Sequence, residues 1–402
     1  MKYIVVLGDG MADEPIPELG GKTPLEAADT PVMDMLARKG CVGRLVTVPE
    51  GFHPGSEIAN LSVLGYNVPE VFEGRGVLEA ANMGVDIKPG DMAMRCNLIC
   101  ISDGRIKNHS GGHISTEEAH EIIATLQQEL GDDTVHFYPG VSYRHLLILK
   151  GGDKRVSCTP PHDVPGTAFA DVMVKADVPE AEATARKLNE LIMRSQKILE
   201  SHPVNLRRKA EGKDCANSIW PWSPGYRPSM RPMTEEFGIK SGVVISAVDL
   251  IFGIGVYAGL KPVYVEGATG LYDTNYEGKA QAAIDALRNG ADFVFLHVEA
   301  SDEAGHEGDY ELKKRTIEYL DNRILRPLMD AVSEMDESVA VAVLPDHPTP
   351  CRLRTHTSAP VPFLIYRPGD TPDDVTVFSE ESAADGGYGL LTGSQFIKSL
   401  IK

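Results

Sequence analysis

The sequence is poor in cysteine and in positive charge, and each deficit excludes a class of protein. Its six cysteines are scattered, and none belongs to the paired pattern of a zinc ribbon, so we expect reduced thiols in a cytoplasmic protein. The net charge of −19 argues against nucleic-acid binding, because phosphate contacts need clustered lysine and arginine. No apolar run reaches the roughly 18 residues of a membrane span, so no membrane association is expected.

Nucleotide-binding signatures are also missing. The sequence contains no P-loop motif, which excludes a P-loop kinase. The glycines between 253 and 259 have the spacing G-x-G-x-x-x-G and follow a helix-like run. This spacing favours helix packing over a dinucleotide site, because the dinucleotide motif is G-x-G-x-x-G after a strand.

Acidic residues and histidines follow three apolar runs of strand length. Asp9 comes after residues 3–7, Asp302 and His306 after 293–298, and Asp346 with His347 after 339–344. Asp302 and His306 are four residues apart and would share one face of a helix. In open α/β sheets, ligands bind beyond the carboxyl ends of the strands. These residues are therefore predicted to meet at one site.

A further histidine completes a set of ligand-type residues. His356 lies in a polar loop that precedes Pro360 and Pro362, which is typical of a ligand delivered by a loop. Three acidic strand ends and this histidine favour a site over a structural role. The mixture of carboxylates and imidazoles suits Zn²⁺ or Mn²⁺, which predicts a metal-dependent enzyme.

Ser56 follows Gly55 at the predicted start of a helix. One interpretation is an N-cap, whose side chain bonds the free backbone N–H groups of the first turn. The other is a nucleophile, whose hydroxyl is activated by a nearby metal. The residues alone leave both interpretations open.

The pattern of elements predicts an α/β protein with an inserted domain. Residues 1–85 and 236–402 are expected to form a doubly wound core, and residues 86–235 an inserted α+β domain. Within the insertion, 116–130 is predicted to be a helix with a capping box at Ser115, and 215–231 a loop without periodicity. In the core, 243–253 is predicted to be a helix and 263–266 a short strand.

The motifs resemble those of the alkaline phosphatase superfamily and, more closely, of the archaeal-type cofactor-independent phosphoglycerate mutases. The matching segments are 6–11, 22–28, 55–60, 302–306 and 346–347. The resemblance implies an alkaline-phosphatase-like core and two divalent ions, Mn²⁺ first, with Zn²⁺, Mg²⁺ or Co²⁺ as substitutes. The implied ligands of one ion are Asp302, His306 and His356, and those of the other are Asp9, Ser56, Asp346 and His347.

The resemblance also implies a reaction. Ser56 would take a phosphoryl group from 2- or 3-phosphoglycerate and return it to the other hydroxyl, while the inserted domain acts as a lid that excludes water. His113 and Arg144 are similar to substrate-binding positions, and Asp163 is similar to a position that would carry protons.

Two segments depart from the family pattern. Residues 220–225 stand where relatives tend to carry an Arg-Gly pair, and Phe252 stands where they often have a basic residue. Arg207, Arg208 and Arg227 are expected to compensate for these missing positive charges. The departures leave two alternatives open, a homoserine-kinase-like phosphotransferase and a phosphomonoesterase of the same superfamily. The expected partner is a small phosphorylated substrate, and a non-enzymatic binding module is disfavoured.

Overall fold

The computed structural model describes all 402 residues and divides into two compact units. Residues Met1–Phe72 and Ser229–Lys402 form what we call the core unit, and Glu73–Pro228 form the inserted unit. The division falls earlier than the predicted boundaries at 85/86 and 235/236. Helix α5 (Arg75–Asn82) packs on strand β3 (Asp91–Ser102) so closely that a Cβ on Gly76 would lie 2.8 Å from the backbone nitrogen of Arg95.

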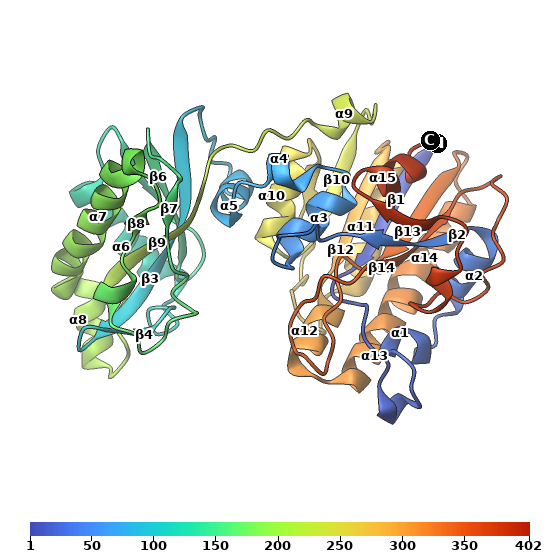
Figure 1. The fold of residues 1–402 in the computed structure, drawn as a ribbon, viewed down its shortest axis with the longest axis horizontal. Coiled ribbons are helices and arrows are strands. Elements are labelled where there is room, and N and C mark those ends of the chain that lie inside the picture. The colour runs from blue at the N-terminus through green and yellow to red at the C-terminus, as the bar shows by residue number, and fades with distance from the viewer. The chain divides into compact units, whose positions relative to one another are not determined.

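The core unit is built on one mixed sheet of eight strands, in the order β11-β10-β12-β1-β13-β14-β2-β15 (Figure 1). Strand β14 runs antiparallel to both of its neighbours, and the other pairs are parallel. The strands are β1 (Lys2–Gly8), β2 (Cys41–Val46), β10 (Gly242–Ile245), β11 (Lys261–Val263), β12 (Phe293–Val298), β13 (Val339–Leu344), β14 (Val361–Tyr366) and β15 (Gly389–Thr392).

Helices cover both faces of the core sheet, which confirms the predicted α/β class. Ile4 and Val6 of β1 share one apolar cluster with α2, α11, α13 and α14. On the opposite face, Phe363 of β14 packs edge-on against Phe396 of α15. The core helices are α1 (Pro24–Ala27), α2 (Pro31–Lys39), α3 (Ser56–Val63), α4 (Val68–Val71), α9 (Met233–Glu236), α10 (Asp249–Tyr257), α11 (Tyr276–Arg288), α12 (Ala300–Glu307), α13 (Tyr310–Tyr319), α14 (Arg326–Ser333) and α15 (Gln395–Leu400).

The three central strands β12, β1 and β13 are almost wholly buried, because each has a strand on both sides and helices on both faces. This explains their nearly continuous apolar sequences. Leu7 of β1 pairs with His297 of β12 and with Leu344 of β13. The three strands therefore end at the same level, and the residues after them meet at one edge of the sheet.

Two predicted core elements are wrong in their type or position. The run 243–253 was expected to be one helix, but it begins as strand β10 and turns helical only at Asp249. Val243–Ile245 are drawn into the sheet by pairing with β12. The strand expected at 263–266 lies earlier, as β11 at Lys261–Val263.

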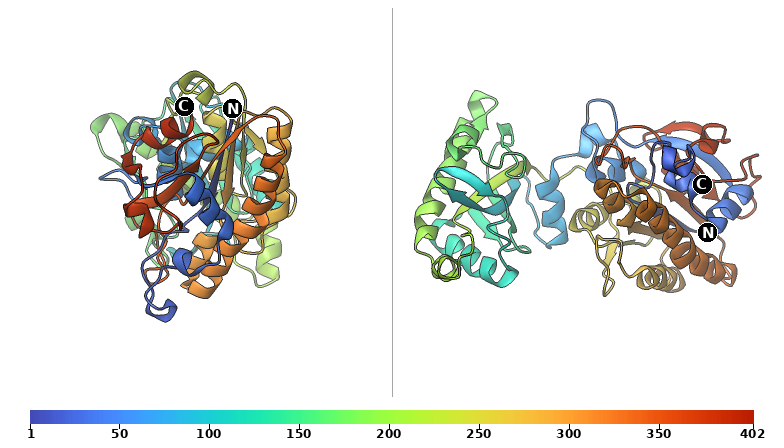
Figure 2. Two further views of the ribbon diagram at one scale, coloured as in Figure 1. Left: turned by 90° about the vertical axis from the view of Figure 1, so that its right-hand side faces the viewer. Right: turned by 90° about the horizontal axis from the view of Figure 1, so that it is seen from below.

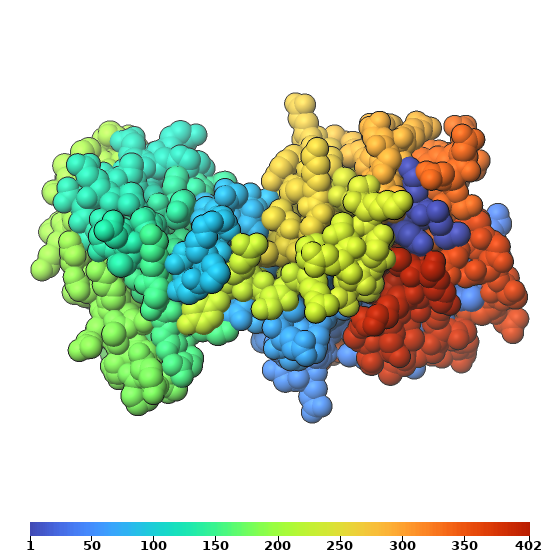
Figure 3. Space-filling view, turned by 90° about the horizontal axis from the view of Figure 1, so that it is seen from above, coloured from blue at the N-terminus to red at the C-terminus, as the bar shows by residue number.

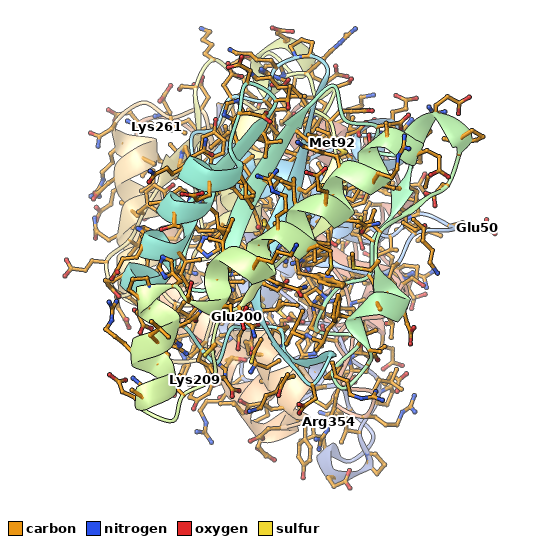
Figure 4. The ribbon with its side chains drawn as sticks, turned by 90° about the vertical axis from the view of Figure 1, so that its left-hand side faces the viewer. Glu50, Met92, Glu200, Lys209, Lys261 and Arg354 are labelled. Carbon is orange, nitrogen blue, oxygen red and sulfur yellow. The ribbon has the colours of Figure 1, made fainter.

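The inserted unit has its own antiparallel sheet, in the order β4-β3-β6-β5 with β9 on the free edge of β3. Helices α6 and α7 pack against it through one apolar cluster, and Figure 4 shows α7 crossing the strands and ending at Glu200. Its remaining elements are β4 (Arg105–Asn108), α6 (Thr116–Leu130), β5 (Val135–Tyr138), β6 (Arg144–Lys150), β7 (Val156–Ser157), β8 (Lys175–Ala176), α7 (Glu182–Glu200), α8 (Pro203–Ala210) and β9 (Ser218–Gly225).

The prediction of a structureless loop at 215–231 is wrong, because Ser218–Gly225 form strand β9. Trp222 lies opposite Arg95 and Trp220 opposite Asn97 in the pairing with β3. Both indoles are buried. Pro221 and Pro224 hid this strand from the sequence pattern, because proline is uncommon inside sheets.

Local capping signals were reliable. The Ser115 hydroxyl accepts from the Glu118 backbone N–H, and the Glu118 carboxylate accepts from the Ser115 backbone N–H. The predicted capping box and helix are therefore confirmed. Thr23 forms a second capping box at the start of α1.

The first and last residues of the chain both lie in the core unit, side by side (Figures 2 and 3). The Tyr3 hydroxyl lies 3.4 Å from the backbone oxygen of Lys402 and donates to it. None of the helices combines the length and the apolar character needed to span a membrane.

We expect His145 to make the inserted unit sensitive to acid. Burial lowers the pKa of His145 on β6 to about 3, and its Nδ1 accepts from the backbone of Gly140. Between pH 6.5 and 3 the unfolded chain therefore binds a proton that the folded unit does not, so stability falls as pH falls. His145→Asn should reduce the slope of the unfolding free energy by up to about 1.4 kcal/mol per pH unit in that window.

Urea denaturation followed by tryptophan fluorescence is the measurement, because both tryptophans of the chain lie in the inserted unit. Leu146→Val on the same strand is the control, since it removes buried methylene volume without a titrating group and should lower stability equally at every pH. An unchanged slope in His145→Asn would contradict the expectation.

Candidate metal centre

The residues that follow β1, β12 and β13 gather at one edge of the core sheet. Because β1 and β13 pair in register, Asp9 lies level with Asp346. Asp302 lies in the first turn of α12, directly after β12. All three carboxylates are buried, although aspartate is rarely buried without a partner.

A first group of ligand-type atoms is formed by Asp302, His347 and His356, all within 4.8 Å of one another. His356 Nε2 lies 3.4 Å from Asp302 Oδ1. His306 joins this group, because its Nε2 lies 3.2 Å from Asp302 Oδ2 and 3.0 Å from His356 Nε2. Loop and helix thus bring three imidazoles to one carboxylate.

A second group consists of Asp9, His297 and Asp346, again with ligand-type atoms within 4.8 Å of one another. His347 Nε2 lies 3.5 Å from Asp9 Oδ1 and 3.5 Å from Asp346 Oδ2. His347 therefore belongs to the first group and also contacts the second.

Ser56 is the first residue of α3, and Gly55 occupies the N-cap position. The N-cap interpretation of Ser56 is therefore wrong. Its Oγ lies 3.3 Å from His347 Nε2. Asn60, one turn later, donates to the Ser56 carbonyl and to Asp346 Oδ2, both at 2.9 Å, which ties the start of α3 to the second group.

The pKa values of two of the buried carboxylates are shifted in opposite directions. Burial raises the pKa of Asp9 well above its ordinary value, and the charges of Asp346 and Asp302 raise it further. Burial also opposes the charge of Asp302, but hydrogen bonds with His306 and His356 hold its pKa well below the usual range. The same contact with Asp302 raises the pKa of His306 to about 9. The Asp9 side of the centre is thus short of positive charge.

His297 shows the same shortage. Burial alone would lower its pKa, but Asp9 and Glu299 raise the pKa of His297 to about 10. The negative groups around His297 thus favour positive charge at this place.

The side chains fit divalent cations. Asp9 Oδ1 and Asn60 Oδ1 are buried and have no hydrogen-bond partner. Such atoms are costly unless something satisfies them, and a cation satisfies a carboxylate oxygen. Carboxylate oxygens with imidazole nitrogens are a ligand set that Mn²⁺, Zn²⁺ and Co²⁺ accept. The two groups are therefore two candidate cation sites.

The backbone around the groups is built for close approach. Gly10 has a φ of +59°, and a Cβ there would lie 2.5 Å from both Asp302 Oδ1 and Thr349 Oγ1. Its N–H donates to Asp346 Oδ1 at 3.1 Å. The Ser301 hydroxyl donates to the Asp9 carbonyl at 2.6 Å. Glycine is required at position 10 by both its conformation and its neighbours.

A buried lysine ties these loops together. Lys313 of α13 is fully buried and forms an ion pair of 2.7 Å with Asp13. It also donates to the carbonyls of Ala12 at 3.0 Å and Thr349 at 2.8 Å. The loop after β1 and the loop after β13 are thus held by one ammonium group.

The chain is similar to a family of known enzymes. A model of the family described as 2,3-bisphosphoglycerate-independent phosphoglycerate mutase matches residues 37–205. A mutase of that name from Methanosarcina acetivorans is 51% identical over 405 residues, with 100% of both chains covered. A probable mutase from Geobacter sulfurreducens is 48% identical, also with 100% of both chains covered.

The chain belongs to the family of 2,3-bisphosphoglycerate-independent phosphoglycerate mutases. This confirms the enzyme family predicted from the sequence. A solved structure of a Pyrococcus horikoshii protein matches with a TM-score of 0.81 and 32% identity, covering 99% of this chain and 96% of that one. A cofactor-independent phosphoglycerate mutase from Thermoplasma acidophilum matches with a TM-score of 0.71 and 26% identity over 100% and 99%.

The side chains that resemble mutase substrate residues are dispersed over the inserted unit. His113 is in a loop with a φ of +53°, and the Arg144 guanidinium stacks on Tyr143 with 5.4 Å to the ring centroid. Asp163 lies 3.6 Å from His162 Nε2. The other arginines of the predicted set already have acidic partners. These are Arg207 with Glu121 at 3.1 Å, Arg208 with Glu118 at 2.5 Å and Arg227 with Asp86 at 2.9 Å.

The aromatic residues that depart from the mutase pattern are buried and pack against neighbouring residues of their own unit. Trp220 Nε1 donates to the Thr159 carbonyl at 2.8 Å, and Trp222 Nε1 to Asn97 at 3.1 Å. Phe252 is buried against Tyr264, with 4.5 Å between ring centroids. These aromatic side chains act as core residues of their units.

The sequence pattern missed two features of the structure. His297 gives no signal in the sequence, because one imidazole inside an apolar strand has no patterned partner. Arg95 was not singled out, yet its guanidinium lies 4.6 Å from the Trp222 ring centroid and 3.2 Å from Glu79. Only the pairing of β3 with β9 brings these side chains together.

Lys313→Met should destabilise the core unit by about 3–5 kcal/mol, because it leaves Asp13 buried without its cation. Urea denaturation followed by circular dichroism measures the loss. Lys314→Met is the matched control. Lys314 is more exposed and only 3.6 Å from Glu311, so its replacement should change stability by less than about 1 kcal/mol. Equal effects of the two variants would contradict the role given to Lys313.

Proposed function

We propose that this chain interconverts 2-phosphoglycerate and 3-phosphoglycerate through a phosphoserine at Ser56. The observation that carries the proposal is the place of the Ser56 hydroxyl. It makes no cap, lies at the N-terminus of α3, and is 3.3 Å from the imidazole that belongs to the first group and also contacts the second. Family membership supports the same substrate, since the relatives are named for this reaction.

Two divalent cations belong to the proposal. Following the family resemblance, Asp302, His306 and His356 would hold one, and Asp9, Asp346, His347 and Ser56 the other. When bound, such cations lower the pKa of a serine hydroxyl and neutralise charge on a transferring phosphoryl group. Mn²⁺ is proposed first because the ligands mix oxygen and nitrogen, and Zn²⁺, Co²⁺ or Mg²⁺ would be substitutes.

Two residues of the chain are proposed to carry out the reaction, Ser56 as nucleophile and Asp163 as proton donor and acceptor. Ser56 gives up its proton to water, its Oγ forms a bond to phosphorus, and the ester bond between phosphorus and the glycerate oxygen breaks. The freed oxygen takes a proton, for which Asp163 is proposed as the donor. In the return step the other glycerate hydroxyl attacks the phosphoserine, Asp163 accepts its proton, and Ser56 regains its own.

Substrate recognition is assigned to the inserted unit. The substrate carries a carboxylate and a phosphate, which guanidinium groups bind by paired hydrogen bonds. Arg144 and His113 are proposed to bind it. Arg207 and Arg227 are proposed with them, and each would have to exchange an acidic partner for the substrate. A cytoplasmic location stays a prediction.

The alternative of a different phosphoryl acceptor rested on the tryptophans of β9 and on Phe252. Because these side chains are buried in packing contacts, they give no specific support to a homoserine-kinase-like activity. A phosphomonoesterase would need water at the phosphoserine, and free phosphate in the assay below reports it.

The assay follows phosphoenolpyruvate formed by coupled enolase when 3-phosphoglycerate is added to Mn²⁺-loaded enzyme. We expect turnover that disappears on extensive chelation and returns with Mn²⁺, with little free phosphate released. Nucleotide-dependent formation of phosphohomoserine, measured in parallel, should be absent. Full mutase activity in verified metal-free protein would contradict the role of the cations.

Ser56→Ala should lower mutase turnover by at least about a thousandfold, because it removes the atom that carries the phosphoryl group. Stability should change by less than about 1 kcal/mol, since Ser56 caps no helix. Mass spectrometry of wild-type enzyme quenched with substrate should find phosphate on the peptide that contains Ser56. Ser62→Ala, a buried serine of the same helix, should keep its turnover. Near-normal turnover in Ser56→Ala would refute a phosphoserine at this position.

A further inference from the structure

His297 lies at the centre of the inference, because it is fully buried and aimed at the second group. It is the fifth residue of β12, opposite Leu7, and Asp9 lies two residues beyond Leu7. Its Nε2 is 3.2 Å from Asp9 Oδ2. The ligand sets implied by the family resemblance do not include it.

The other ring nitrogen of His297 is committed to Glu299. Nδ1 lies 3.2 Å from Glu299 Oε1. The Glu299 carboxylate also accepts from Lys279 Nζ at 2.5 Å, from Ser246 Oγ at 2.8 Å and from the Ala247 backbone at 2.8 Å. A carboxylate paired with a buried ammonium group accepts hydrogen bonds and donates none, so His297 Nδ1 carries the hydrogen.

This arrangement leaves Nε2 to face the second group. Nε2 is buried and, despite its closeness to Asp9, is not aligned for a hydrogen bond with any partner. Asp9 Oδ1 is equally buried and equally without a partner. The ligand-type atoms of His297, Asp9 and Asp346 converge within 4.8 Å of one another, as ligands around a common point do.

We propose that His297 Nε2 is a further ligand of the cation held by Asp9 and Asp346. The inference rests on the cations of the proposed function and adds a nitrogen to that site. Ligating histidines usually give their other N–H to a carboxylate, which is the role that Glu299 has here. Lys279 keeps that carboxylate charged and fixed, since it also donates to the His297 carbonyl at 3.0 Å.

A nitrogen ligand at this position has a consequence for metal choice. Mg²⁺ binds oxygen ligands and keeps several waters, whereas Mn²⁺, Co²⁺ and Zn²⁺ accept imidazole. His297 should therefore favour these three cations over Mg²⁺ at the second group. Replacing His297 should lower the affinity of the second group for Mn²⁺ more than its affinity for Mg²⁺.

The direct test is the state of the His297 ring in protein labelled with ¹⁵N-histidine and loaded with Zn²⁺. We expect one protonated nitrogen, Nδ1, and one metal-bound nitrogen, Nε2. The signal is assigned by its absence from His297→Gln. Two protonated nitrogens in the loaded protein would overturn the inference, because His297 would then be an imidazolium paired with Asp9.

Metal titration gives a second readout. In His297→Gln, the affinity of the first group for Mn²⁺ should equal that of the wild type, and the affinity of the second group should fall at least tenfold. The corresponding loss of Mg²⁺ affinity at the second group should be smaller. His136→Gln, on β5 of the inserted unit, is the matched control and should leave both affinities unchanged. Unchanged Mn²⁺ affinities in a folded His297→Gln would overturn the inference. If this variant does not fold, the ring state in the wild type decides.

The two proposals can fail separately. Wild-type protein that ligates a cation through His297 but has no mutase activity would contradict the proposed function alone. An active mutase whose His297 carries two ring protons would contradict the present inference alone.

Discussion

Three buried carboxylates at one edge of a sheet are the constraint on which the rest of this structure depends. Asp9, Asp302 and Asp346 are brought together because the parallel strands β12, β1 and β13 end at one level. Burial and mutual repulsion make the charged state of Asp9 unfavourable. Imidazoles relieve Asp302, but nothing in the protein relieves Asp9 to the same extent. Divalent cations would remove this imbalance by neutralising the carboxylates.

Two fully buried lysines of the core unit form ion pairs next to the carboxylates of the centre. Lys279 on α11 pairs with Glu299 behind His297, and Lys313 on α13 pairs with Asp13 beside the loops after β1 and β13. Each ammonium group also bonds backbone carbonyls, so its desolvation is offset by several contacts. Two helices on the same face of the sheet thus position the two sides of the centre. Rigid support of this kind keeps ligand geometry within a few tenths of an ångström.

The sequence predicted the features that depend on residues close to one another in the chain. Capping residues fixed α6, and apolar runs with acidic ends located the residues of the centre. Strand β9 was missed because Pro221 and Pro224 break its pattern, and it becomes a strand only by pairing with β3. His297 was missed for a similar reason, since its place beside Asp9 depends on the register between two strands. The role of Ser56 could not be chosen until its hydroxyl was placed beside His347.

The central claim is that the carboxylates and imidazoles form two cation sites. Anomalous scattering from crystals grown with Mn²⁺ tests it most directly. The account predicts two strong peaks in the core unit, one within bonding distance of Asp302 and His356, and one within bonding distance of Asp9 and Asp346. A single peak, or none at these carboxylates in protein that is active with Mn²⁺, would contradict it.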